Sequence, residues 1–154
     1  MKRIILIGLA IIMILMVSCK KNEEDEMNYD NLDKTLIERV GDSFSAMIKA
    51  LNDKDYDKYI SYYRISEEEK NLIIEIHKSS SNDFKQEYSI YNVLAFENED
   101  GTISATVVID NKSTSIANKV VSKLREYTYY TLIEENGKFY IESYEIGMTQ
   151  TLDW

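Results

Sequence analysis

Cysteine and histidine, side chains that often act as nucleophile and base, each occur once in this chain of 154 residues. Any Ser/His/Asp set would therefore depend on His77, which follows Ile76 near the end of a predicted helix. A histidine at a helix C-terminus is favoured as a cation near the negative end of the helix dipole. We expect His77 to be exposed or to play this local role, and we assign no catalytic residue.

Carboxylates are numerous, but their spacing forms no recognisable metal site. Asp53, Asp55 and Asp57 alternate as in a calcium-binding loop, yet no glycine or terminal glutamate completes that loop. Zinc prefers cysteine and histidine ligands, and the sequence contains no Cys/His cluster. With five glycines and no proline, the sequence also lacks a glycine-rich phosphate loop. We therefore predict neither a metal nor a cofactor.

Twelve tyrosines suggest a different chemistry. An isomerase-like site needs a carboxylate base and a buried acid or tyrosine that face one cavity. The tyrosines that could supply such a phenol include Tyr59, Tyr62, Tyr91, Tyr129 and Tyr140. Tyrosines also fill half-exposed concave sheets without any catalytic role, because the ring is apolar while the hydroxyl stays in water. We prefer this second explanation and keep an enzyme as the alternative.

The N-terminal residues follow the order of a secretory signal peptide. Lys2 and Arg3 precede an unbroken apolar run over residues 4–17, and the small residue Ser18 follows it. As a helix this run would extend about 21 Å at ~1.5 Å per residue, against a hydrocarbon core of roughly 30 Å. It is therefore too short to span a membrane comfortably.

The stretch from Leu15 to Cys19 resembles the bacterial lipobox, in which a diacylglyceryl group is coupled to the cysteine sulfur and a signal peptidase cuts just before it. Ser18 matches the small residue of that pattern, whereas Met16 departs from the commoner leucine. The alternative is an ordinary signal peptide, or an uncleaved anchor, with an incidental cysteine.

The lipobox resemblance implies a division of the chain. Residues 1–18 would be a lipoprotein signal peptide, residues 19–31 a lipidated Cys19 with an acidic tether, and residues 32–154 a folded domain. The resemblance also implies a cell-envelope location, lipid-anchored to a membrane and facing outside the cytoplasm. Two or three acyl chains hold a protein on a bilayer far better than one.

The charge of the chain limits its partners. The formal net charge is −9, and loss of residues 1–18 would make the remainder more acidic because Lys2 and Arg3 go with them. A polyanionic surface repels phosphate backbones, and no stripe of Lys and Arg with interleaved aromatics is present, so nucleic acid is excluded as a partner. Since Cys19 is the single cysteine, the folded domain contains no disulfide.

Three helices are predicted at the start of the domain. Apolar residues recur at intervals of four and three over 31–51, and tyrosines mark a shorter helix over 56–63. Ser66 and Glu69 form the capping box of a third helix, which the polar stretch 79–83 is expected to end. The predicted apolar face of this third helix consists of Leu72, Ile73 and Ile76.

An antiparallel sheet is predicted to follow. Alternating apolar residues indicate strands over 88–95, 103–109, 120–133 and 139–146. Asp100-Gly101 marks one hairpin turn, and Asn136-Gly137 marks a tight turn of the primed type. Residues 111–125 fit a helix or a strand, and we prefer a strand from about Val120. Residues 149–154 show no useful periodicity.

This order of elements resembles the NTF2-like, or cystatin-like α+β, superfamily. The resemblance covers about residues 32–147 and is carried by the short second helix at 52–59 and the closing hairpin at 134–145, with Phe139 where tryptophan is usual. It implies an α+β fold in which three N-terminal helices pack on a curved antiparallel sheet of about four strands, forming a cone with an open mouth.

Members of this superfamily include ketosteroid isomerases, dehydratases, ligand-binding modules and many lipoproteins, so the fold alone does not select a function. Because no catalytic set is recognisable, we predict a non-catalytic module that binds a small molecule, a peptide or a protein in the cone. A small cavity enzyme of isomerase or hydrolase type, using a carboxylate and a tyrosine, is the alternative. The resemblance also suggests a homodimer formed through the outer sheet face.

Overall fold

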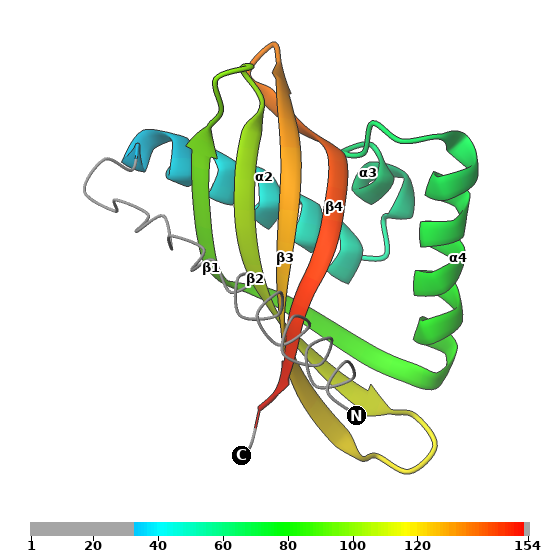
Figure 1. Ribbon diagram of the computed structural model, residues 1–154. Coiled ribbons are helices and arrows are strands. Elements are labelled where there is room, and N and C mark those ends of the chain that lie inside the picture. The colour runs from blue at the N-terminus through cyan, green and yellow to red at the C-terminus, as the bar shows by residue number, and fades with distance from the viewer. Residues whose placement is uncertain (1–32, 153–154) are drawn as a thin grey trace, which may run out of the picture. The chain divides into compact units, whose positions relative to one another are not determined.

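Three helices precede four strands in the part of the chain that the computed structural model describes, residues 33–152 (Figure 1). The elements are α2 (Lys34–Asn52), α3 (Tyr56–Ile60), α4 (Glu67–Asp83), β1 (Phe84–Glu97), β2 (Ile103–Ser115), β3 (Val121–Glu135) and β4 (Lys138–Thr151). The strands form one antiparallel sheet in the order β1-β2-β3-β4. The predicted α+β class is therefore confirmed, while the lipobox-like stretch and the acidic tether lie outside the described residues.

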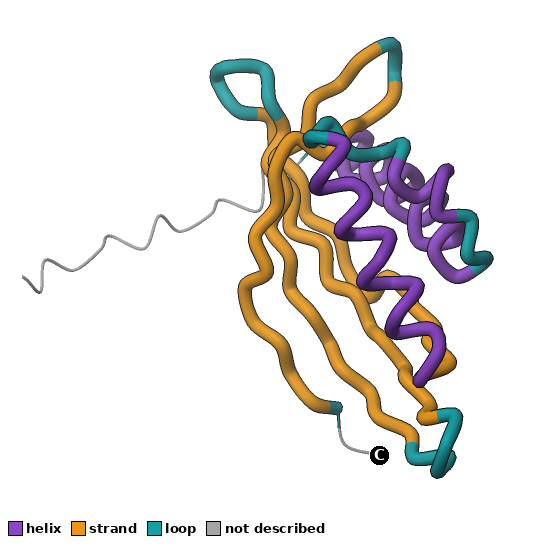
Figure 2. The backbone as a smooth tube through the Cα atoms, turned by 90° about the vertical axis from the view of Figure 1, so that its right-hand side faces the viewer, coloured by secondary structure: helices purple, strands orange, loops and turns teal. Residues whose placement is uncertain are grey.

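Helix α2 forms the centre of the core. It begins at the N-cap Asp33, whose carboxylate accepts hydrogen bonds from the backbone N–H groups of Thr35 and Leu36. Its apolar stripe packs against the sheet, where the ring centroids of Phe44 and Tyr130 are 4.7 Å apart. All three helices lie on the same side of the sheet (Figure 2). No helix within residues 33–152 is long and apolar enough to cross a membrane.

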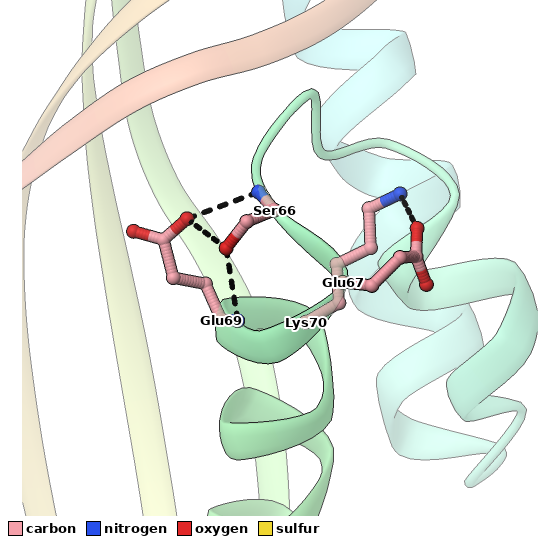
Figure 3. A network of polar contacts seen from close by, with 4 residues as sticks. All are labelled: Ser66, Glu67, Glu69 and Lys70. Carbon is pink, nitrogen blue, oxygen red and sulfur yellow. Dashed lines mark hydrogen bonds and ion pairs between the residues drawn. The ribbon is translucent and has the colours of Figure 1, made fainter.

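Helix α4 keeps its predicted start but not its predicted end or apolar face. The capping box is present: the Ser66 N–H donates to the Glu69 carboxylate, and the Glu69 N–H donates to the Ser66 hydroxyl (Figure 3). The helix continues through residues 79–83, and within it the hydroxyl of Ser81 donates to the carbonyl of Lys78. The helix has no fully buried residue.

The predicted apolar face of α4 is largely exposed. Leu72 and Ile76 are 57% and 55% accessible, and only Ile73 is partly buried against the core. Of the three residues of the predicted apolar face, Ile73 packs against the core and Ile76 borders the cavity. Spacing identified an apolar face, but part of that face borders a hollow rather than a filled core.

The strands extend beyond their predicted limits. Strand β1 begins at Phe84 directly after α4, and β4 continues to Thr151 through a segment in which no element was predicted. Strand β3 begins at Val121, which confirms the preference for a strand from about residue 120. Asn136 and Gly137 both have positive φ, at 53° and 76°, as a primed hairpin turn requires.

Bulges change which side chains of the edge strands face the helices. On β1 the pairing shifts between Ile90 and Asn92. On β4 one shift places Glu142 outside the pairing, and a second falls between Ile146 and Thr149. The alternation of inward and outward residues reverses at each extra residue, so a simple period of two does not describe either strand.

The loop after α3 is fixed to the edge of the sheet. The N–H of Ile141 donates to the carbonyl of Tyr62 at 2.7 Å, and the N–H of Arg64 donates to the carbonyl of Ile141 at 2.7 Å. Tyr63 thereby forms a parallel bridge to β4 and is 4% exposed. This contact places the α3 tyrosines against the concave face.

Candidate functional site

A cavity of about 330 Å³ lies between the three helices and the concave face of the sheet. Its apolar lining comes from every layer of the fold and consists of Met47, Ile48, Leu51, Ile73, Ile76, Ile109, Leu124 and Ile146. Such a predominantly apolar hollow with a few polar groups is the usual form of a small-molecule site.

Five tyrosines contribute hydroxyl groups to the cavity, beside the polar side chains of His77, Asn111, Glu126 and Thr149. Tyr59 of α3 and Tyr63 of the following loop are four residues apart in the chain, and their hydroxyl oxygens are 2.9 Å from each other. The ring of Tyr144 on β4 lies edge-on to Tyr63, at 6.1 Å between centroids, and 6.2 Å from the ring of Tyr130 on β3. Tyr88 of β1 completes the set. Together these five residues form what we call the tyrosine ring.

Four residues of the tyrosine ring have a raised pKa and stay protonated over the ordinary pH range. Burial raises the pKa of Tyr59 and of Tyr88 to about 12, with a further contribution from the negative charge of Glu126. Burial also raises the pKa of Tyr63 and Tyr130 above the usual value. These four hydroxyls are therefore neutral hydrogen-bonding groups at pH 7.

His77 belongs to the cavity, contrary to the expectation from the sequence. Because α4 continues to Asp83, His77 lies inside the helix rather than at its negative end. Its imidazole is edge-on to Tyr59 at 5.3 Å and to Tyr88 at 6.3 Å between ring centroids. Burial lowers its pKa below the usual 6.5, so the ring is neutral at pH 7. No residue among 33–152 hydrogen-bonds to its nitrogens.

Glu126 is the carboxylate of the cavity and was missed in the sequence. It sits on the inner face of β3, where the hydroxyl of Thr128 donates to it at 3.1 Å. The preceding residue, Arg125, faces the other side of the sheet, binds Asp110 with two hydrogen bonds of 2.7 and 2.9 Å and stacks on Tyr91. The adjacent charged residues Arg125 and Glu126 therefore lie on opposite faces of the sheet.

Asn52 ties the end of α2 to the wall of the cavity. Its side-chain amide donates to the carbonyl of Tyr88 at 2.8 Å and accepts from the N–H of the same residue at 2.9 Å. We call this pair of bonds the Asn52 clamp. Because β1 is an edge strand, these backbone groups would otherwise have no partner strand.

Of the five tyrosines singled out in the sequence, the structure places one in the cavity. Tyr59 lines the cavity, whereas Tyr91 and Tyr129 are 60% and 51% exposed, and Tyr62 and Tyr140 border a separate hollow. Period-two alternation in β3 was the available signal for Tyr130 and Glu126. The bulges removed the corresponding signal in β1 and β4.

The three alternating aspartates do not gather around a common point. Asp55 is the N-cap of α3 and accepts from the N–H of Lys58, and Asp53 pairs with Lys49 one turn earlier. Within residues 33–152 there is no group of three or more His, Cys, Asp or Glu side chains placed to hold a metal ion.

The separate hollow collects basic side chains. It lies between α2, α3 and the hairpin that joins β3 to β4, and its cations are Arg39, Lys58, Arg64 and Lys138. Two of them are already neutralised by glutamates of that hairpin, since Arg39 pairs with Glu134 and Arg64 with Glu135.

Two solved structures share this fold. Aln2 from a Streptomyces species has a TM-score of 0.62 and 15% sequence identity, covering 75% of this chain and 91% of its own. ActVI-ORFA from Streptomyces coelicolor has a TM-score of 0.64 and 12% identity, covering 75% and 96%. No protein-family model and no curated protein matches the sequence. At these identities the likeness concerns the fold alone, three helices packed on one side of a four-stranded antiparallel sheet.

Proposed function

We propose that this protein is a membrane-anchored bacterial lipoprotein whose cone binds a small molecule outside the cytoplasmic membrane without converting it. The observation that carries the binding role is the apolar cavity surrounded by the tyrosine ring. Its volume of about 330 Å³ lies at the lower end of the ~300–1,000 Å³ typical of ligand pockets, which favours a small molecule over a peptide or protein.

The chemistry of the lining supports binding rather than catalysis. A general base needs a pKa near the working pH and a partner that orients it. Tyr59, Tyr63 and Tyr130 remain protonated at pH 7 because burial raises the pKa of each. His77 has a suitable ring but no carboxylate or carbonyl among residues 33–152 that holds its orientation. The polar atoms therefore serve to orient a ligand.

An enzyme of isomerase or hydrolase type is the second candidate, and one observation favours it. Glu126 lies close enough to Tyr59 and Tyr88 for its charge to raise the pKa of both phenols. A carboxylate base opposite a protonated tyrosine is the pair that such a reaction uses. Recovery of a bound ligand unchanged after prolonged incubation supports binding alone, and a chemically altered ligand supports the enzyme.

Binding in the cavity is tested by two matched tryptophan substitutions on β4. Ile146 lines the cavity and Met148 does not, and the two residues are 54% and 56% exposed. Ile146→Trp places an indole in the cavity, so we expect it to abolish ligand binding. Met148→Trp adds the same bulk elsewhere and should leave binding intact.

The measurement is thermal stabilisation and calorimetry of the folded domain with a panel of small aromatic and aliphatic molecules. Ligands extracted from membranes with the native protein extend the panel. A panel in which every active compound stabilises Ile146→Trp as much as Met148→Trp would contradict binding at this site.

The anchor rests on Cys19 and on the lipobox-like stretch, which lie outside the described residues. Metabolic labelling with an alkyne palmitate should mark the wild-type protein in membranes and leave Cys19→Ala unlabelled. Equal labelling of both proteins would contradict the lipid anchor.

A further inference from the structure

The charged side chain that lines the cavity is negative and has no positive partner there. Within the part of the chain that the structure describes, no lysine or arginine lines the cavity, and Glu126 is the one carboxylate that does. Glu126 also takes part in no ion pair among residues 33–152, and its partner there is the hydroxyl of Thr128, which donates a hydrogen bond. By contrast, Asp110 and Glu134 outside the cavity are both paired with arginines.

A half-buried carboxylate without a counter-ion is unfavourable unless a ligand supplies the positive charge. His77 does not supply it, because burial lowers its pKa and leaves the imidazole neutral at pH 7. The basic side chains of this region lie instead around the separate hollow beside α2 and α3. Among residues 33–152, therefore, none supplies the cation that would complement Glu126.

The walls of the cavity fit an organic cation better than a metal ion. The tyrosine ring presents aromatic rings from β1, β3, β4 and the α3 region to one space. Aromatic faces attract cations through the ring quadrupole, and proteins hold quaternary ammonium groups in cages of such rings. A metal ion would need several oxygen ligands around it, whereas a tertiary or quaternary ammonium group needs only aromatic faces and one nearby carboxylate.

We propose that the cavity binds a tertiary or quaternary amine with an apolar body, its ammonium group held by Glu126 and the tyrosine ring. This inference rests on the proposed ligand-binding function and names its ligand class. The apolar body lies against the aliphatic side chains of α2 and β2, among them Ile48, Leu51 and Ile109. An anion of the same size would meet Glu126 without any compensating lysine or arginine from the described part of the chain.

The test compares three probes of similar size and different charge. Benzyltrimethylammonium is the cation, neopentylbenzene is its neutral isostere with carbon in place of nitrogen, and phenylacetate is the anion. Calorimetry or chemical-shift titration of the folded domain gives each affinity. We expect the cation to bind at least tenfold more tightly than the neutral isostere, and phenylacetate to bind more weakly than both.

Two glutamate variants locate the effect. Glu126→Gln keeps the shape of the side chain and removes its charge, so it should weaken binding of the cation about tenfold and leave the neutral isostere unchanged. Glu145→Gln makes the same charge change on the convex face, where Glu145 pairs with Tyr129, and should alter neither affinity. Tyr144→Leu is a third variant at a 44% exposed position, and it should weaken the cation more than the isostere.

The outcomes separate this inference from the function on which it rests. If the neutral isostere binds as tightly as the cation in the wild type, or if Glu126→Gln leaves the cation affinity unchanged, the cavity binds ligands and the cation inference is wrong. Tighter binding of phenylacetate overturns it as well. If none of the three probes binds, and no compound of the panel binds to the wild type or to Met148→Trp, the proposed binding function itself is wrong.

Discussion

The Asn52 clamp offers a quantitative test of how the cavity wall is held. Asn52→Ala removes both hydrogen bonds to the backbone of Tyr88 at the last residue of α2, where the helix itself is least affected. Asn52→Asp keeps an acceptor for the Tyr88 N–H but sets a carboxylate against the Tyr88 carbonyl. It also places a negative charge at the negative end of the helix dipole.

The size of the effect follows from the two bonds. Each intramolecular hydrogen bond contributes about 0.5–1.5 kcal/mol net, and water can replace part of it at an exposed position such as this one. We therefore expect Asn52→Ala to lower the free energy of unfolding by about 1–2 kcal/mol. For a domain of about 120 residues this corresponds to a fall in Tm of roughly 3–10 °C. Asn52→Asp should lose at least as much.

Urea unfolding followed by circular dichroism measures the change, with Asn92→Ala as the matched control. Asn92 is an exposed asparagine of β1, the strand that contains Tyr88, and lies four residues from Tyr88. Its side chain forms no hydrogen bond with any of the described residues. A midpoint for Asn52→Ala within error of that of Asn92→Ala would refute the reasoning, because the clamp would then contribute nothing to stability.

Three further predictions concern α4 and His77. Ser66→Ala removes the acceptor of the Glu69 N–H and should cost about 1 kcal/mol in urea unfolding, and an unchanged midpoint would show that the capping box is dispensable. Burial lowers the pKa of His77 below 6.5, so the unfolded chain binds a proton more readily than the folded chain, and the free energy of unfolding should fall as the pH drops through 6.5. His77→Gln should flatten this pH dependence, and an identical slope in the variant would contradict the reasoning. Backbone amides of α4, which has no fully buried residue, should exchange with deuterium faster than those of α2, and equal protection would show that α4 does not open separately.

Much of the fold was predictable because its signals are local. The capping box at Ser66 and Glu69 and the primed turn at Asn136-Gly137 depend on neighbouring residues, and both are present in the structure. The α2 stripe repeats often enough for its period to be unambiguous, and it was predicted within a few residues of its limits.

The candidate site was less predictable because it depends on tertiary contacts. Tyr59 and Tyr91 look alike in sequence, but a fixed loop buries the first, while the second covers the guanidinium of Arg125 on the convex face. The role of His77 was misjudged because the polar residues 79–83 resemble a helix end and are in fact helical. The polar atoms of the cavity come from several elements, so no single segment carries their pattern.

The bulges of β4 have a consequence for how this strand tolerates change. The extra residue Glu142 lets Ile141 and Tyr144, three residues apart, both face the inner side of the sheet, opposite Leu132 and Tyr130. Loss of Glu142 alone would make the pairing regular and leave Tyr144 and Ile146 facing the cavity, whereas loss or gain of a residue within the regularly paired stretch would exchange the two faces of the residues beyond it. Homologues that keep this cavity should therefore change the length of β4 only at its two bulges.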